Sequence, residues 1–336
     1  MDKRIKKWVI SLLSLLIILI ATITLALCVG EMNISIVELI EILNKKSGIE
    51  YSILMNIRIP RVLLGIAVGG SLSISGLVLQ AIYRNPLVEP YTLGISGGAA
   101  LGVALGIVFG ATSFFSIFSL PIYGIIGAFI TIVIMYFLSM RRTHLNINSI
   151  LLTGVMISFI SSSAIMFLLA TTTSQKLQNI IFWTMGSLDQ PNKSLIIIVL
   201  TASVIGLGVF YYFVRQLNAL RLGESHAKHL GVNTSLIIKI LFIVASVITG
   251  ISVATVGVIG FVGLVVPHLL RYLLGNDYRI LLISTFLGGA IFLILSDILS
   301  RTIISPNELP IGVITGLIGG TIFIIAVSKS NKLLKF

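Results

Sequence analysis

Ionisable side chains that could do chemistry are scarce in this 336-residue chain, because only 10% of its residues are charged. Asp297 and Arg301 lie four residues apart, a spacing that predicts an ion pair on one face of a helix. His268 stands alone, and His226 and His229 have no third ligand nearby in the sequence, as a metal site would require. We therefore expect no metal site and no bound cofactor.

Nucleotide hydrolysis is not expected from this chain. A phosphate-binding loop needs a glycine-rich turn that ends in Gly-Lys-Ser/Thr, and the sequence contains no Gly-Lys dipeptide. No paired acidic motif and no nucleophile with a neighbouring base stands out either. The chain is therefore predicted not to be an enzyme, and any ATP hydrolysis would come from another subunit.

The composition indicates a polytopic membrane protein. Hydrophobic residues make up 57% of the chain, and its mean hydropathy is +1.11. A soluble fold of this length could not cover so much apolar surface, because soluble domains carry about a quarter charged residues. This excludes a soluble enzyme and a simple nucleic-acid binder, although the formal net charge is +12. We expect no nucleic-acid partner.

Continuous apolar runs of about 20 residues predict membrane-spanning helices. The stretch 236–274 is too long for one helix and contains Gly257, where we expect a break followed by a short second pass. The other predicted spans are Trp8–Val29, Val62–Ile82, Thr92–Phe109, Ile122–Met140, Ile147–Leu169, Ser194–Val214, Ile280–Ser296 and Pro310–Val327.

The positive-inside rule decides between nine and ten spans. Ten spans place 16 of the 23 basic residues in cytoplasmic segments and 7 outside, whereas nine spans give 12 against 11 and no bias. The fold is therefore predicted to be all-α, with ten transmembrane helices and both termini cytoplasmic. We treat residues 1–336 as a single transmembrane domain.

Two of the predicted helices carry small and hydroxyl residues at close spacing. Such residues either let helices pack closely or line a polar path, and the sequence leaves both interpretations open. A third row, Gly65, Gly69 and Ser73, is assigned first to internal packing. The candidate path residues are Thr153, Gly154, Ser158, Ser161 and Ser162 in one helix, and Gly312, Thr315, Gly316 and Gly320 in the other.

Two sets of polar residues outside the spans suggest docking surfaces. The segment 215–234 is the largest predicted cytoplasmic loop and is expected to form two short helices broken at Gly223 and Gly231. On the other side, Arg58, Arg61 and Arg301 belong to predicted external loops at 57–61 and 298–309. Arginine suits fork-like pairing with carboxylates, so these side chains are candidates for binding an acidic partner.

Six ordered motifs, beginning near residue 58, together resemble the FecCD-type permeases of importers for iron–siderophores, haem and vitamin B12. They are Arg58-Ile-Pro-Arg61; Ser75-Gly76 with Gln80, Asn85-Pro86-Leu87 and Glu89-Pro90; Leu93-Gly94-Ile95-Ser96-Gly97-Gly98-Ala99; Leu222-Gly223-Glu224 with Ala227 and Leu230-Gly231-Val232; Gly260 to His268 with Arg271; and Glu308-Leu309-Pro310-Ile311-Gly312.

This resemblance implies a permease in the cytoplasmic membrane of a bacterium or archaeon that works by alternating access. Its partners would be a second permease subunit, two cytoplasmic ATPase subunits and an external binding protein that delivers a metal chelate. The implied ATPase-coupling residues are Leu222, Gly223, Glu224, Ala227, Leu230 and Gly231. Arg58, Arg61 and Arg301 would receive glutamates of the binding protein, and the two small-residue helices would line the path.

The favoured cargo is a ferric siderophore, with haem or cobalamin next. The alternative from a different class is an ion-coupled secondary transporter that works through Asp297 or His268, because such carriers need an ionisable group within the membrane.

Overall fold

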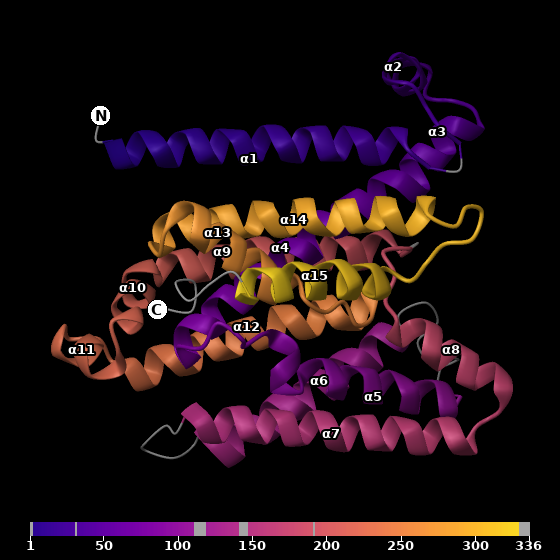
Figure 1. Ribbon diagram of the computed structural model, residues 1–336. Helices are drawn as coiled ribbons and strands as arrows, with labels where there is room; N and C mark the ends of the chain where they lie inside the picture. Colours follow the sequence, from indigo (N-terminus) through magenta and orange to yellow (C-terminus); the bar gives the residue numbers. More distant parts are fainter. Residues whose placement is uncertain (1–2, 31, 111–118, 141–146, 191, 329–336) are drawn as a thin grey trace.

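The computed structural model describes residues 3–30, 32–110, 119–140, 147–190 and 192–328, and within these ranges it contains helices and no strand. Most of the long helices lie side by side along one direction, while short helices gather at the two ends of the bundle (Figure 1). Five of the basic residues used to predict the orientation lie outside the described residues: Arg141, Arg142, Lys329, Lys332 and Lys335.

Seven helical stretches of the described residues are long and apolar enough to cross a membrane. One of them is continuous over Ile49–Tyr83 and joins α3, η1 and α4. The helices of these stretches are α1 (Lys3–Cys28), α3 (Ile49–Ile53), η1 (Leu54–Arg58), α4 (Ile59–Tyr83), α6 (Ser119–Met135), η5 (Tyr136–Met140), α7 (Ile147–Thr171), α9 (Lys193–Tyr212), α12 (Thr234–Val256) and α14 (Tyr278–Thr302).

Three further predicted spans correspond to shorter apolar helices, which are α5 (Ile95–Val108), α13 (Val262–Leu274) and α15 (Ile311–Ser328). The expected break in the stretch 236–274 is present. α12 ends at Val256, and Gly257 follows with a φ of +77°, a conformation that glycine adopts without a steric penalty. The chain then runs without helical structure to the start of α13.

The short helices mark the two ends of the bundle. The end with α10 (Val214–Arg221) and α11 (Glu224–His229) also holds the start of α1 and the end of α15, at the left of Figure 1. The opposite end holds α2 (Ile36–Lys45), α3 and α8 (Ser174–Thr184). The first residues of α1 and the last residues of α15 therefore lie at the same end as the segment 215–234.

The central helix is α4, which packs against α9, α12, α13 and α14. Its contact with α14 is close because Gly69 meets Gly289 across the interface, and a Cβ atom on either glycine would collide with the carbonyl oxygen of the other. Gly76 approaches the backbone of Gly263 in α13 in the same way. Close backbone packing of this kind stabilises helix association in lipid, where the hydrophobic effect does not drive helices together. The assignment of Gly65, Gly69 and Ser73 to internal packing is confirmed.

The predicted external loops are partly helical in the structure. Residues 57–61 belong to η1 and the first turn of α4, because Pro60 occupies a position of that turn where its missing N–H costs no helical hydrogen bond. Residues 298–302 form the last turn of α14, so only 303–309 lie outside a helix.

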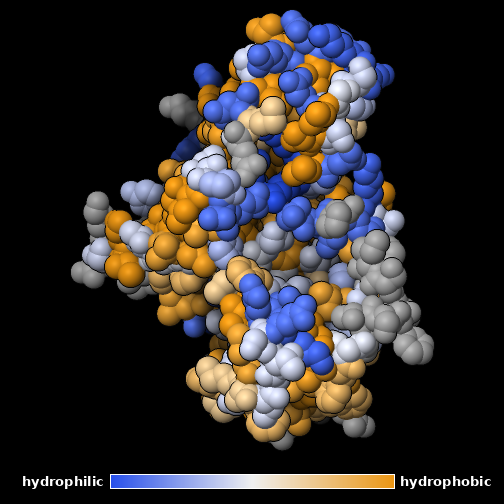
Figure 2. All heavy atoms as spheres, turned by 90° about the vertical axis from the view of Figure 1, so that its right-hand side faces the viewer, coloured by the Kyte–Doolittle hydropathy of each residue, from blue (hydrophilic) through white to orange (hydrophobic). Residues whose placement is uncertain are grey.

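Polar residues gather on the end face that carries α2 and α3, while apolar residues lie along its flanks (Figure 2). α2 begins with a capping box, in which Ser35 Oγ accepts from the Glu38 N–H at 3.2 Å and Glu38 Oε2 accepts from the Ser35 N–H at 2.8 Å. These hydrogen bonds hold the pKa of Glu38 below its usual value. The capping box thus fixes the start of α2 on this polar end face.

Candidate functional site

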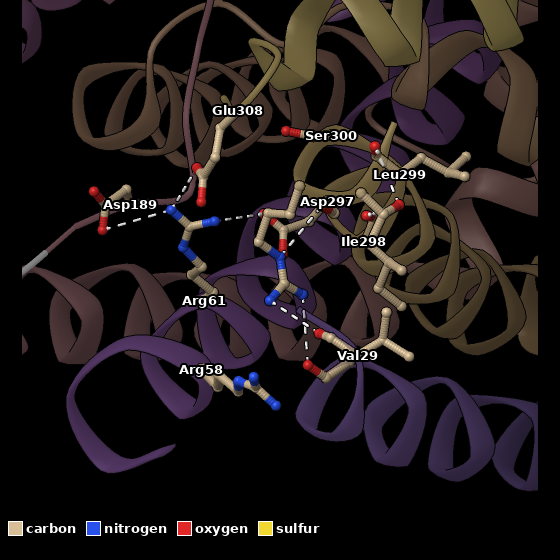
Figure 3. Close-up of polar contacts among 12 residues, drawn as sticks. Val29, Arg58, Arg61, Asp189, Asp297, Ile298, Leu299, Ser300 and Glu308 are labelled. Carbon is tan, nitrogen blue, oxygen red and sulfur yellow. Dashed lines mark hydrogen bonds and ion pairs between the residues drawn. The ribbon is translucent and has the colours of Figure 1, made fainter. Parts of the chain in front are cut away.

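Three arginines gather where α1, α4 and α14 meet (Figure 3). Arg58 is the last residue of η1, Arg61 lies in the first turn of α4, and Arg301 lies in the last turn of α14. The sequence predicted that these residues lie in external loops as candidates for docking; in the structure all three side chains are buried. The reason is that each guanidinium has partners inside the same chain.

Arg61 lies among three carboxylates contributed by three different segments. Its Nη2 is 2.7 Å from Glu308 Oε2 and 3.8 Å from Asp189 Oδ1, and its Nη1 is 3.7 Å from Asp297 Oδ1. The predicted ion pair within α14 is confirmed, because Arg301 Nε lies 3.0 Å from Asp297 Oδ2. The buried carboxylate of Asp297 is therefore shared by two guanidiniums.

Arg58 and Arg301 also bind the end of α1. Arg58 donates to the carbonyl oxygens of Leu27, Cys28 and Met32, and Arg301 lies 3.5 Å from the carbonyl oxygens of Ala26 and Val29. The last carbonyls of a helix have no intrahelical partner and carry partial negative charge, so a cation stabilises them. No local pattern in the sequence predicts this, because the partners lie about 30 and about 270 residues apart.

A polar cavity of about 290 Å³ lies beside Arg58 on the end face of the bundle. Asn33, Glu38 and Glu50 line it together with the Arg58 side chain. Gly30 leaves room at the same place, since a Cβ atom there would lie 2.9 Å from Arg58 Nη2. The cavity therefore places Arg58 beside two carboxylates of the same chain, in addition to the carbonyl oxygens that it binds.

The segment 215–234 folds as α10 and α11, with Gly223 between them at φ +115° and Gly231 after them at φ +79°. Leu222 and Leu230 are more than half exposed, whereas Ala227 is fully buried. The two leucines give this polar segment an apolar surface, which is a common feature of protein–protein contacts.

Polar contacts hold the same segment in place. Glu224 Oε1 lies 2.8 Å from Lys228 Nζ and accepts from the Thr234 hydroxyl at 3.3 Å. Arg221 donates to the Asn276 carbonyl at 2.7 Å, and Asn218 donates to Asp277 Oδ1 at 3.2 Å. The segment is thereby anchored to the turn between α13 and α14.

Asp277 extends this anchor to the start of the chain, because its Oδ2 lies 2.8 Å from Arg4 Nη2. No role of Asn218 or Asp277 was predicted from the sequence. Asp277 could have been recognised as the helix cap of α14, because its side chain accepts from the Arg279 N–H. Its two distant partners have no such local signal.

The hydroxyl residues of α7 are divided between contacts and open surface. Gly154 packs against the backbone of Leu93, Ser161 is buried, and the Ser158 hydroxyl lies 3.5 Å from the Tyr91 carbonyl. Thr153 donates to the Ser149 carbonyl one turn earlier in the same helix, and Ser162 is exposed. Part of this row therefore packs against η2 (Pro90–Leu93) and α5.

The small residues of α15 differ in the same way. Gly312 packs against the carbonyl oxygens of Met185 and Val258, whereas nothing lies within 4 Å of a Cβ atom built on Gly316. The Thr315 side chain is buried and donates to the Gly312 carbonyl at 3.2 Å, and a Cβ atom on Gly320 would lie 3.7 Å from the Phe261 ring. α15 packs against α13 and α14, and α7 against α5 and η2.

The non-helical stretch between α12 and α13 is held by two side chains of the segment between α4 and α5. The Ile259 N–H donates to the Tyr91 hydroxyl at 2.8 Å, and the Phe261 N–H donates to Glu89 Oε2 at 3.2 Å. Phe261 has a φ of +68° and packs against Gly319 of α15. The sequence contains Glu89-Pro90 as a motif, but gives no sign that this carboxylate pairs with a backbone 172 residues away.

The environment of Glu89 predicts a pH-dependent stability. Burial raises the pKa of Glu89 to about 7 in the folded protein, against an ordinary value of 4.5. As the pH rises from 4.5 towards 7, the unfolded chain loses this proton first, so Glu89 lowers the free energy of unfolding. Glu89→Gln keeps an oxygen acceptor and carries no charge.

We expect Glu89→Gln to be more stable than the unmutated protein, and we expect this gain in the free energy of unfolding to be larger at pH 8 than at pH 5. The measurement is thermal unfolding in detergent. Glu89→Leu leaves the Phe261 N–H without an acceptor, and its free energy of unfolding is expected to be about 1–3 kcal/mol lower than that of Glu89→Gln at both pH values. If the difference in unfolding free energy between Glu89→Gln and the unmutated protein is the same at both pH values, Glu89 is not a buried carboxylate that titrates in this range.

Known proteins with similar sequences are membrane permeases. The hemin transport system permease HmuU of Yersinia pestis is 39% identical over 288 residues, which cover 84% of this chain and 85% of that protein. The vitamin B12 import permease BtuC of Salmonella typhi is 35% identical over 98% of both chains. The molybdate import permease MolB of Haemophilus influenzae is 32% identical over 96% of both.

The fold has a similar solved counterpart. A structure described as an inward-facing conformation of a metal-chelate-type ABC transporter matches with a TM-score of 0.84 and 31% identity, over 95% of this chain and 99% of that one. The model of the FecCD transport family matches residues 17–329. The chain is therefore a multi-pass membrane protein that belongs to the FecCD transport family of ABC-transporter permeases.

Proposed function

We propose that this chain is one of two permease subunits of an ATP-driven importer that moves a metal chelate across the cytoplasmic membrane of a bacterium or archaeon. Similarity to hemin and vitamin B12 permeases and to a metal-chelate-type transporter supports a chelate as cargo. A ferric siderophore is the first candidate, and haem or cobalamin comes next. The second permease subunit is either a copy of this chain or a paralogue.

One arrangement carries the proposal. An anchored segment with exposed leucines lies at one end of the bundle, and a cluster of arginines lies at the other. The first feature suits an ATPase subunit and the second suits an acidic binding protein. We place the α10–α11 end in the cytoplasm, with ten spans and both termini on that side, because this orientation also satisfies the positive-inside rule.

In the proposed mechanism, movement of the ATPase pair reaches the membrane through Leu222, Gly223, Glu224, Ala227, Leu230 and Gly231. The anchor from α10 to the turn before α14 supports this role, because it connects the segment that would move with the ATPase to a long helix through hydrogen bonds of α10. The exposed residues of α7 and α15, among them Ser162 and Gly316, would line the path between the paired subunits during alternating access.

The contacts of Asp297 argue against an ion-coupled carrier. A coupling carboxylate must be able to exchange its ion or proton during transport. Asp297 is already paired with Arg301 at 3.0 Å and Arg61 at 3.7 Å, so its charge is compensated within the chain. His268 packs edge-on against Phe323, with 6.0 Å between the ring centroids. ATP-driven transport is therefore the better interpretation.

The docking role predicts that Arg61→Gln weakens binding of the external binding protein. We expect at least a tenfold loss in affinity, because a buried charged partner of a carboxylate is removed. The measurement is binding of the binding protein to the purified permease–ATPase complex, with assembly of that complex checked by size-exclusion chromatography.

Lys193→Gln is the matched control, since it removes one exposed positive charge at the same end of the bundle. The docking role of the arginine cluster would be refuted by equal binding-protein affinities of Arg61→Gln and the unmutated complex.

The coupling role predicts that Leu230→Asp separates the ATPase from the permease. The side chain is exposed, so the substitution leaves the fold intact while placing a charge in an apolar contact. We expect loss of the ATPase subunits during co-purification, whereas Leu230→Met should retain them. Normal co-purification and normal ATP-dependent uptake by Leu230→Asp would show that this leucine is not part of the contact.

A further inference from the structure

Glu308 differs from the other carboxylates around Arg61. It lies nearest to the guanidinium, at 2.7 Å, and its side chain is 46% exposed, although that of Arg61 is only 5% exposed. Asp297 is buried with its two arginines, and Asp189 is 65% exposed and lies 3.8 Å away. Figure 3 shows Glu308 and Asp189 reaching Arg61 from two separate segments. Glu308 therefore combines the shortest ion-pair distance to Arg61 with a side chain that is partly in contact with solvent.

The charges in this cluster are balanced. Arg61 and Arg301 form ion pairs with the carboxylates of Asp189, Asp297 and Glu308, and Arg58 beside them shares a cavity with Glu38 and Glu50, so no guanidinium is left without acidic neighbours. A fourth carboxylate from a partner would bring an uncompensated negative charge into a poorly solvated site, which is unfavourable. A partner carboxylate can pair with Arg61 at full strength only if a resident carboxylate leaves.

Glu308 is connected to α15 by a short and constrained segment. The Leu309 N–H donates to the Ser300 carbonyl at 2.9 Å, and the Ser300 hydroxyl donates to the Leu309 carbonyl. Pro310 follows, and the first N–H groups of α15 donate to the carbonyls of Gly186 and Met185, at 3.2 and 3.1 Å. Because Glu308 lies three residues before the first residue of α15, its release from Arg61 would loosen the entrance of that helix.

We propose that Glu308 occupies Arg61 in the resting permease and that a carboxylate of the docked binding protein takes its place. The exchange releases the segment 303–310. Docking at Arg61 thereby changes the position of the start of α15. This inference rests on the proposed docking function and adds the resident competitor and the helix that responds.

The test compares Glu308→Gln with two matched variants in the assembled permease–ATPase complex. Glu308→Gln removes the competing charge and keeps the size of the side chain. Glu41→Gln removes an exposed negative charge from α2 at the same end of the bundle, and Asp189→Asn removes the more distant carboxylate. The readouts are the Kd of the ligand-free binding protein and the ATPase rate without binding protein.

We expect Glu308→Gln to bind the binding protein three- to tenfold more tightly and to show a raised ATPase rate without it. Asp189→Asn should change the Kd less than twofold, and Glu41→Gln should leave it unchanged. A merely structural role of Glu308 would weaken binding rather than strengthen it, so the direction of the change is decisive.

If the unmutated complex binds but Glu308→Gln binds equally or more weakly, the exchange is refuted and the docking function stands. An equal gain in Glu41→Gln would also refute it, because the effect would then come from the general field of the end face. Failure of the unmutated complex to bind any binding protein would refute both the docking function and the exchange.

Discussion

Interrupted helices in a membrane protein leave backbone polar groups that lipid cannot solvate, and the structure depends on how these groups are paired. Arg58 and Arg301 donate hydrogen bonds to the carbonyls at the end of α1. The N–H groups between α12 and α13 donate to the side-chain oxygens of Tyr91 and Glu89. The first N–H groups of α15 reach the backbone that follows α8. Each break therefore becomes a junction between segments far apart in the sequence, and the candidate sites lie at these junctions.

The same requirement explains why the few charges of the chain are grouped. A buried guanidinium is tolerated only with partners, so Arg301, which binds the end of α1, also pairs with Asp297, and Arg61 beside it pairs with carboxylates of three segments. The resulting cluster has a structural role and a candidate recognition role at one place. At the opposite end, the Asp277 anchor holds the segment 215–234, for which we propose a coupling role, without burying a charge in the bundle.

Several features could be predicted from the sequence because their signals are local. Apolar runs located the long helices, Gly257 marked the break before α13, and the spacing of Asp297 and Arg301 predicted their ion pair. The burial of the arginines could not be predicted, since their partners come from segments distant in the sequence. Glu308 and Glu89 appeared in recognised motifs, but only the fold brings Glu308 to Arg61 and Glu89 to the backbone of Phe261.

The central claim is that the energy for transport comes from ATP hydrolysed by a partner and that an external protein delivers the cargo. The most direct measurement is uptake of a radiolabelled ferric siderophore into liposomes that contain the permease–ATPase complex with its binding protein. The account predicts uptake that needs both ATP and the binding protein and that persists when a protonophore abolishes the proton gradient. Uptake driven by a proton gradient in the absence of ATP would contradict it.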